Sequence, residues 1–510
     1  MRTLAAELLT AQQNGYPTGG YQPALKCVLY SNNSATSYDY SFNPASTTNR
    51  LIHVEQSEHV FNGDSGVILL QNYDGSLPAD LTGYHVDIGW GMNTSAGLDY
   101  CDALGESTPR LWVLKHSNIL GAPRGKTKVR YTALELGGIW NTVLKQQPVR
   151  LGSTPTFRYD DVFTIAALND LTIYGVIEYL LETALAAQTG LPISLAALGD
   201  QDDSLISTIV PFPTGLTPLR WINSNTPNSF HTYGEVIDSL LELTKCFIVS
   251  TSNVAFKIVY PQAADSIVKY YYSSNASGHP YYEVMDARIA TIPNHIECFG
   301  GYDDETGLSE YVGDWFNSAD FSTPPTRTGT PPAFTPAAIL AAYDGTHMPV
   351  TRSIWEKSFA SDAECDARAL MEGNKLINET VGGRIITPMD ASIQLGDNIQ
   401  AYGTTGNAMQ RVSGITRSFY SGVNPVYQSI FTIGGNSNYY TPIIGDRNPS
   451  GYMEKDNNPY SGTNYETWLT NNNLEAILKV FGRFPSHEDW VQWKKKGGVD
   501  ILGMGVRLND

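Results

Sequence analysis

The segment Gly121-Ala-Pro-Arg-Gly-Lys-Thr127 has the residue types of a phosphate-binding loop, in which backbone amides surround a phosphate and a lysine neutralises it. That loop needs four residues between its glycines, and only three separate Gly121 from Gly125. It also needs a strand before it and a helix after it. Alternating residues on both sides predict the tip of a β-hairpin instead, so we expect no nucleotide chemistry here.

Two further groups come close to known metal sites but lack required ligands. His487 and Glu488 begin like the helix of a zinc protease, but Val491 stands where the second histidine is needed. The acidic run Asp200-Gln-Asp-Asp203 lacks the glycine and the final glutamate of the known calcium loop. We interpret the run as a solvated turn, and a structural cation there stays an open alternative.

The histidines and paired carboxylates do not form a catalytic pattern. His53 and His59 are six residues apart, and His85 is isolated between predicted strand residues, which favours core or surface roles. The pairs Asp160-Asp161 and Asp303-Asp-Glu305 could perform acid–base chemistry only if the fold brought them together across a cleft. The sequence therefore predicts no catalytic residue, no metal ligand set and no cofactor.

The residues best suited to binding are three tryptophans near the C-terminus: Trp468, Trp490 and Trp493. Residues 441–510 are predicted to form an extended arm, which is rich in Asn, Tyr, Gly and Pro at its start and carries two short helices near its end. Aromatic anchors on a short amphipathic helix suit docking into a groove of a partner. Folding of these helices back onto their own chain is the equal alternative.

The composition favours strands joined by tight turns. Charged residues make up only 16% of the 510 residues, whereas Gly (46), Pro (28) and Tyr (30) are abundant. The formal net charge is −18 and the sequence pI about 4.9. Because binding of phosphates requires lysine and arginine, such an acidic chain is not expected to hold nucleic acid tightly.

The five cysteines are widely spaced and include no CxxC pair. Their odd number argues against a disulfide framework and favours buried free thiols in a protein folded in a reducing cytosol. At the N-terminus, Glu7 interrupts the apolar run, and Leu4, Leu8 and Ala11 share one helical face, which predicts an amphipathic helix and not a secretory signal. No stretch approaches the 18 apolar residues of a membrane-spanning helix.

The elements divide the chain into four predicted domains of an α+β, mainly β protein. Residues 1–155 read as short strands of a β-barrel or sandwich. Residues 156–265 read as an α/β domain, and residues 266–440 as a second β-rich domain with a helix inserted at 361–380. The arm of residues 441–510 follows.

Two segments have clear periodicity. Residues 233–243 show the stripe of a helix with one buried face, and two strands of alternating residues, 246–249 and 254–260, follow it as a hairpin. The inserted helix begins with a capping box formed by Ser361 and Glu364. Its apolar face is predicted from residues that recur three and four apart: Ala363, Ala367, Leu370, Asn374 and Ile377.

The order of several segments across residues 20–435 resembles that of bacteriophage tail-tip or baseplate hub proteins. The helix–hairpin of residues 233–260 is one of these segments. The others, in chain order, are Gln71-Asn-Tyr-Asp-Gly75, Tyr84-His-Val-Asp-Ile-Gly-Trp-Gly91, Arg288-Ile-Ala-Thr-Ile-Pro-Asn-His-Ile-Glu-Cys-Phe-Gly300 and Leu395-Gly-Asp-Asn-Ile399. Residues 436–510 lie outside the resemblance.

The resemblance implies a structural virion protein that forms a homotrimer. Each chain of such a hub supplies two tail-tube-like barrels, so that three copies adapt a six-fold tail tube to a three-fold tip. The implied partners are the distal tail or tail tube protein, the tape measure protein and the spike or receptor-binding proteins, with assembly in the host cytoplasm. DNA would pass through the ring without specific binding, and three copies with a formal charge of −54 (3 × −18) would repel it.

Two other function classes remain alternatives. The many tyrosines and tryptophans suit a receptor- or carbohydrate-binding tail protein, since aromatic rings stack on sugars. A tail-associated glycosidase or peptidase is the weaker alternative, because no motif supports it.

Overall fold

The computed structural model describes residues 1–434 with gaps at 15–21, 33, 61–62, 102–106, 122–127, 150–171, 199–231, 243, 245, 260–264, 274–277, 289–292, 302–308, 329–333, 346–347, 357–358, 360, 380, 403–409 and 422–425. The described chain is mainly β with fewer helices, which confirms the predicted fold class. None of the helices in this described part is long and apolar enough to cross a membrane.

The N-terminal region begins with a helix and continues in strands. The amphipathic helix predicted at the N-terminus is α1 (Ala6–Asn14), with Leu8 and Ala11 buried. Eight strands follow: β1 (Gln22–Tyr30), β2 (Ser37–Asp39), β3 (Leu51–His59), β4 (Ser65–Gln71), β5 (His85–Thr94), β6 (Gly97–Cys101), β7 (Leu111–Gly121) and β8 (Lys128–Gly138).

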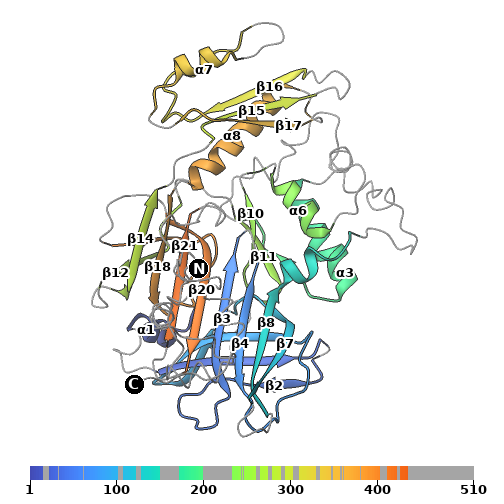
Figure 1. Ribbon diagram of the computed structural model, residues 1–510, viewed down its shortest axis with the longest axis vertical. Helices are drawn as coiled ribbons and strands as arrows, with labels where there is room; N and C mark the ends of the chain where they lie inside the picture. Colours follow the sequence, from blue (N-terminus) through green and yellow to red (C-terminus); the bar gives the residue numbers. More distant parts are fainter. Residues whose placement is uncertain are drawn as a thin grey trace, which may run out of the picture.

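A second β region lies near the end of the described chain. Its strands are β12 (Lys269–Tyr272), β13 (His279–Pro280), β14 (Glu283–Arg288), β18 (Val381–Pro388), β19 (Asn398–Ala401), β20 (Gln410–Tyr420) and β21 (Val426–Ile433). All seven join the eight N-terminal strands in one 15-stranded sheet, in which β20 pairs with β19, β21 and β3. Strands β14, β18, β21, β20, β3, β4, β8 and β7 run side by side in the body of the molecule (Figure 1).

An α/β unit separates the two β regions in the sequence and packs beside the sheet (Figure 1). Its helical part comprises η2 (Trp140–Leu144), α2 (Ile173–Glu178), η5 (Tyr179–Leu185), α3 (Ala186–Thr189) and α6 (Tyr233–Glu242). A small sheet joins β9 (Ser194–Leu195), β10 (Phe247–Ser250) and β11 (Ala255–Val259). The predicted helix–hairpin is thus α6, β10 and β11. Gly190 ends the preceding helix in the left-handed conformation.

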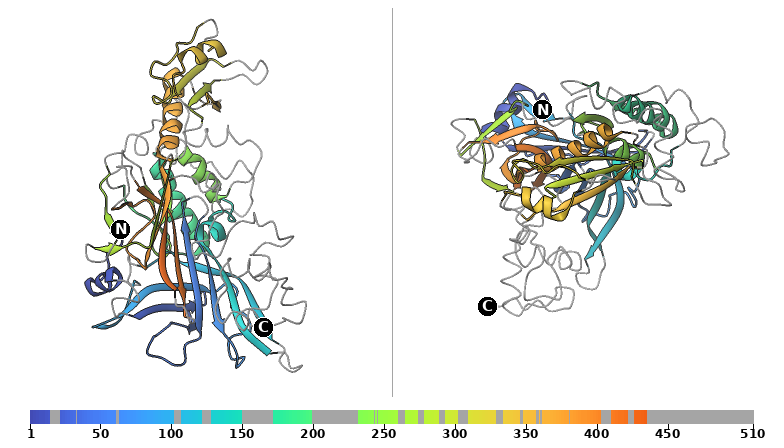
Figure 2. Two further views of the ribbon diagram at one scale, coloured as in Figure 1. Left: turned by 60° about the vertical axis from the view of Figure 1, so that its left-hand side comes forward. Right: turned by 90° about the horizontal axis from the view of Figure 1, so that it is seen from above.

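The segment around the predicted inserted helix forms a module with a sheet and a core of its own. A three-stranded sheet of β15 (His295–Gly300), β16 (Tyr311–Phe316) and β17 (Thr351–Glu356) packs on α8 (Asp362–Glu379), and α7 (Pro336–Ala342) lies at its outer end. This module occupies one end of the long axis of the molecule, beyond the large sheet (Figure 2). The predicted domain boundaries stay a prediction.

The predicted apolar face of the inserted helix is wrong. Ser361 caps α8 by accepting the Glu364 amide, as the capping box predicts. The face that packs on the sheet, however, is formed by Cys365, Ala369 and Leu376. Leu370 and Ile377 of the predicted face are 48% and 41% exposed. The sheet accepts small and medium side chains because Trp315 already fills the space above Gly373.

Candidate functional site at the junction of the two β regions

The two β regions meet where β3 pairs with β20. The strands are antiparallel, with His59 opposite Gly414 and His53 opposite Tyr420. Their inward side chains share one hydrophobic core, to which β3 contributes Val54 and the second region contributes Phe419. The junction therefore fixes the two regions to each other by backbone hydrogen bonds and by a common interior.

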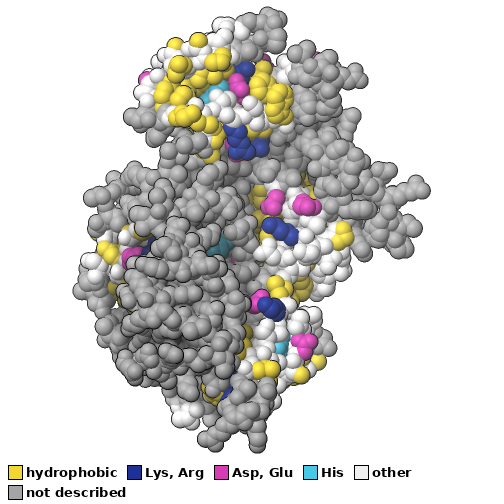
Figure 3. All heavy atoms as spheres, viewed as in Figure 1, with side chains coloured by type: hydrophobic (Ala, Val, Ile, Leu, Met, Phe, Trp, Pro, Cys, Tyr) yellow, Lys and Arg dark blue, Asp and Glu magenta, His cyan; other side chains and the backbone are white. Residues whose placement is uncertain are grey.

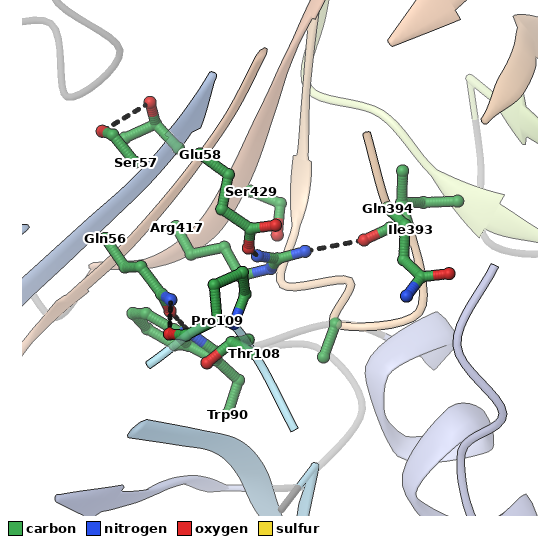
Figure 4. A network of polar contacts seen from close by, with 12 residues as sticks. Gln56, Ser57, Glu58, Trp90, Thr108, Pro109, Ile393, Gln394, Arg417 and Ser429 are labelled. Carbon is green, nitrogen blue, oxygen red and sulfur yellow. Dashed lines mark hydrogen bonds and ion pairs between the residues drawn. The ribbon is translucent and has the colours of Figure 1, made fainter. Parts of the chain in front are cut away.

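Glu58 lies at the centre of this junction with its side chain fully buried. Because alternate strand residues share a face, Glu58 points inward together with Val54, and Arg417 points inward from β20. The carboxylate pairs with Arg417 and, at 3.3 Å between Oε2 and an Arg2 nitrogen, with Arg2. The Glu58–Arg417 pair is visible between the strands in Figure 4.

The two guanidinium groups extend the network to neighbouring segments. Arg2 donates to the carbonyl of Ile393 at 3.0 Å and to that of Thr251, in the β10–β11 turn, at 2.9 Å. Arg417 donates to the carbonyl of Ile393 at 2.8 Å. The network thus ties the N-terminal segment, the α/β hairpin and the loop after β18 to the β3–β20 pair. A buried ion pair between two strands favours the one register in which its two charges meet.

Further buried hydrogen bonds lie beside the Glu58 network (Figure 4). The indole nitrogen of Trp90 donates to Gln56 Oε1 at 2.8 Å, and Gln56 Nε2 donates to the carbonyl of Pro109 at 3.4 Å. Thr108 donates its hydroxyl to the carbonyl of Ile88 at 2.9 Å. Hydrogen bonding of these buried groups avoids the free-energy cost of leaving them unsatisfied.

Asp64, just before β4, is a buried carboxyl near this junction with a raised pKa. Burial raises the pKa of Asp64 from 3.8 to about 8, and the negative charge of Glu58 acts in the same direction. A hydrogen bond with Ser250 and the positive charges of Arg2 and Arg417 oppose this effect. Asp64 is therefore mostly protonated at neutral pH, and the junction carries a neutral acid beside its ion pairs.

A separate buried cluster surrounds Asp390 after β18. Burial would raise the pKa of Asp390, but the ammonium of Lys269, at 2.5 Å, holds it well below its usual range. Tyr271 donates its hydroxyl to the same carboxylate at 2.8 Å. Burial lowers the pKa of His279 to about 4, so this histidine is neutral at physiological pH. The cluster holds β12 and β13 against the loop after β18.

The module contains a group of residue types that suit a metal ion. Ligand atoms of His295, Glu297 and Asp314 lie within 4.8 Å of one another. Arg327, however, donates to both oxygens of Asp314 and lies 3.8 Å from Glu297. His295 also contacts Asp314, at 3.2 Å. The guanidinium thus supplies the positive charge that a metal would bring, and we interpret the group as an ion-pair network.

The sequence-predicted sites have different outcomes. Trp468, Trp490 and Trp493 lie outside the described residues, as do His487-Glu488, Asp200–Asp203, Asp160-Asp161 and Asp303–Glu305. The strands on either side of residues 122–127 are β7 and β8, paired antiparallel from Gly121 opposite Lys128, which confirms the predicted hairpin.

All three histidines lie on strands. His53 and His59 belong to β3, and His85 begins β5. Burial lowers the pKa of His53 to about 4, and it also lowers the pKa values of His59 and His85. These histidines are therefore neutral at physiological pH.

Sequence analysis missed the junction residues Arg2, Glu58 and Arg417. The only signal was a charged residue at an inward position of two alternating strands. Nothing in the sequence indicated that those two strands, more than 350 positions apart, pair with each other.

No protein-family model matches the chain, and no curated protein sequence does so either. Among solved structures, the fold is similar to a tail protein from Neisseria meningitidis MC58, with 8% identity, a TM-score of 0.49, and coverage of 82% of this chain and 97% of that chain. It is also similar to a prophage MuSo2 tail protein from Shewanella oneidensis, with 8% identity, a TM-score of 0.48, and coverage of 80% and 98%. A prophage tail protein from Listeria monocytogenes EGD-e is similar at 10% identity and a TM-score of 0.41, with coverage of 81% and 94%.

Proposed function

We propose that the chain is a structural protein of a bacteriophage tail, the hub of a tail tip or baseplate, and that three copies form a ring. The observation that carries this proposal is the β3–β20 pairing, which joins the two β regions in one sheet with a shared core. A segment of a pseudo-six-fold ring made from three chains needs two β units fixed side by side in every chain. The buried ion pairs of Glu58 hold the units in one relative position.

The order of hub-like sequence segments supports the same proposal. In the ring, the proposed neighbours are the distal tail or tail tube protein, the tape measure protein and spike or receptor-binding proteins. The C-terminal tryptophans Trp468, Trp490 and Trp493 would dock on one of these neighbours. The protein would be found in the virion, at the tail tip, after assembly in the host cytoplasm, and would need neither a catalytic residue nor a cofactor.

The charge supports passage of DNA through the ring. Because the formal charge of three copies is −54 (3 × −18), the lumen would repel phosphates. Purified protein is expected to leave double-stranded DNA unshifted in a gel mobility assay at about 50 mM salt, where phosphate contacts are strong. A salt-sensitive shift would overturn the proposed lumen.

The hub proposal is tested by the mass and shape of the purified protein. Light scattering is expected to give three times the chain mass of 55.9 kDa, about 168 kDa. Negative-stain class averages are expected to show a ring with six similar lobes. A stable monomer, or a particle without a ring, would count against the proposal.

A receptor- or carbohydrate-binding role is the second candidate, and exposed aromatic pairs favour it. Trp355 is 51% exposed and stacks on Phe299 at 4.5 Å between ring centroids. Tyr402 is 57% exposed and stacks on Tyr272 at 4.9 Å. Hydrophobic side chains also cover much of the visible face of the module (Figure 3). Such flat aromatic surfaces suit sugar rings. Adhesion to host cells that Trp355→Ala abolishes would support this role.

A further inference from the structure

The inference concerns the solvent-facing side of α8 in the module. This helix has two faces, of which one packs on the sheet through Cys365, Ala369 and Leu376. The opposite face carries a narrow uncharged stripe: Ala363, Ala367, Leu370, Asn374 and Ile377. Leu370 is 48% exposed and Ile377 41% exposed. An apolar stripe on the outer side of an 18-residue helix is unusual for a helix that meets only water.

The spacing of the stripe is that of a coiled-coil seam. Its five residues follow one another at intervals of 4, 3, 4 and 3 positions, which is the pattern of the a and d positions of a heptad. In this frame Ala367 and Asn374 occupy a positions, and Leu370 and Ile377 occupy d positions. A single asparagine at an a position sets register and the number of helices in many coiled coils. The small alanines would let helix backbones approach closely.

The charges beside the stripe are already engaged within the module. Asp362 accepts the Val312 amide at 2.8 Å, and Asp366 accepts the Asp314 amide at 3.0 Å. These two carboxylates also cap amides of the β16 strand, which makes that strand less available for pairing with another chain. Glu372 lies on the sheet-packed face of α8, opposite the stripe, where its carboxylate pairs with Arg352 at 2.7 Å and Arg368 at 3.4 Å.

An uncharged stripe is complementary to another uncharged stripe and not to a strongly charged partner. We propose that the stripe of α8 packs against the same stripe of neighbouring copies of this chain. The inference rests on the proposed ring, and it names the surface through which the copies meet. Identical faces of three copies meet only on the symmetry axis. The three α8 helices would therefore run together on the axis at the end of the ring where the module lies. They would close the lumen at that end, so passage of DNA would require them to separate.

Site-specific cross-linking tests the seam directly. All five native cysteines are buried, so the full-length chain offers a background with no exposed thiol among them. Leu370→Cys places a thiol at the centre of the stripe. Leu340→Cys on α7 is the matched control, because Leu340 is 65% exposed in the same module but outside the stripe. Mild oxidation is expected to convert most of the Leu370→Cys chains to covalent dimers and to leave the Leu340→Cys chains monomeric.

Light scattering of the same samples separates this inference from the hub proposal. A trimer with cross-linking only at position 370 supports both. A trimer without that cross-link overturns the seam and leaves the hub. A dimer with the cross-link supports the seam and overturns the trimeric hub. A monomer in solution overturns both.

A charge placed on the stripe gives an independent measurement. Leu370→Asp would put like charges in contact across the seam, whereas Leu340→Asp would not. Because Leu370 is half exposed in the single chain, its substitution is expected to keep the circular dichroism spectrum unchanged. We expect Leu370→Asp to raise the dissociation constant of the assembly by about tenfold or more and Leu340→Asp to leave it within about twofold. Equal dissociation constants for the two variants would overturn the seam.

Discussion

Glu58 and Arg417 form a fully buried ion pair across the antiparallel strands β3 and β20. The two residues are 359 positions apart in the sequence, and they come from the first and the last β region of the described chain. The α/β unit and the module, which lie between them in the sequence, are therefore excursions from one continuous sheet. The pair lies where the first and the last β region join, so its loss should destabilise both regions together.

Substitution of Glu58 by glutamine should strongly destabilise the protein. It leaves the guanidinium groups of Arg2 and Arg417 buried without their carboxylate, a change that typically costs about 3–5 kcal/mol. Urea denaturation followed by tryptophan fluorescence measures the loss. Glu135→Gln is the control, because Glu135 forms an exposed pair with Lys115 that should contribute about 1 kcal/mol or less. Similar losses for the two variants would contradict the role given to Glu58.

Asp64 should make stability depend on pH between about pH 4 and pH 8. Its pKa is about 8 in the folded chain and near its ordinary 3.8 when unfolded, so over this window the folded state binds a proton that the unfolded state has released. The contribution of Asp64 to the free energy of unfolding is therefore present at low pH and falls as the pH rises, by about 1.4 kcal/mol per pH unit.

The variant Asp64→Asn tests that pH dependence, because the amide stays neutral at every pH. Thermal unfolding of both proteins from pH 5 to pH 8 is expected to show a stability difference that moves in favour of the variant as the pH rises. A difference that stays constant over this range would show that Asp64 is not protonated in the folded chain.

Gly373→Ala should loosen the module. A Cβ at this position would lie 2.1 Å from Trp315 Cδ2, so the indole would have to move. Overpacking of this kind costs about 1–3 kcal/mol, which exceeds the gain of about 1 kcal/mol in helix propensity. The rate of limited proteolysis within the module measures this loosening. The double variant Gly373→Ala/Trp315→Leu supplies the check, since a smaller side chain should make the alanine tolerable, and no such rescue would contradict the stated clash.

Local patterns predicted the elements of this fold well. The helix–hairpin of α6, β10 and β11 and the hairpin of β7 and β8 each depend on contacts between residues close in sequence, so alternation and turn residues are sufficient to predict them. The pairing of β3 with β20 is different. It depends on the shared core of two regions that are distant in sequence. A single sequence does not indicate which two of its strands pair through their buried faces.

The helix α8 shows why periodicity alone can select the wrong face. Its two stripes both have helical spacing, and the stripe with Leu370 and Ile377 is the more apolar of the two. The sheet nevertheless takes the stripe with Cys365 and Ala369, since Trp315 and Gly313 leave room only for small residues. Steric fit decided the orientation, and the stripe that sequence analysis described as the apolar face of the helix is the surface we propose as a seam.

Removal of Arg327 should convert the ion-pair network of the module into a metal site. In the folded chain its guanidinium donates to both Asp314 oxygens and lies near Glu297, where a cation would bind. We therefore expect zinc to leave the melting temperature of the natural protein unchanged.

Arg327→Ala frees His295, Glu297 and Asp314, whose ligand atoms lie within 4.8 Å of one another and have the types that zinc prefers. This variant should melt at a lower temperature, and zinc should restore part of the loss by binding the folded state. The double variant Arg327→Ala/Glu297→Gln should respond less, because it offers a weaker ligand. Stabilisation of the natural protein by zinc would show instead that Arg327 yields to a metal and that the network is a binding site.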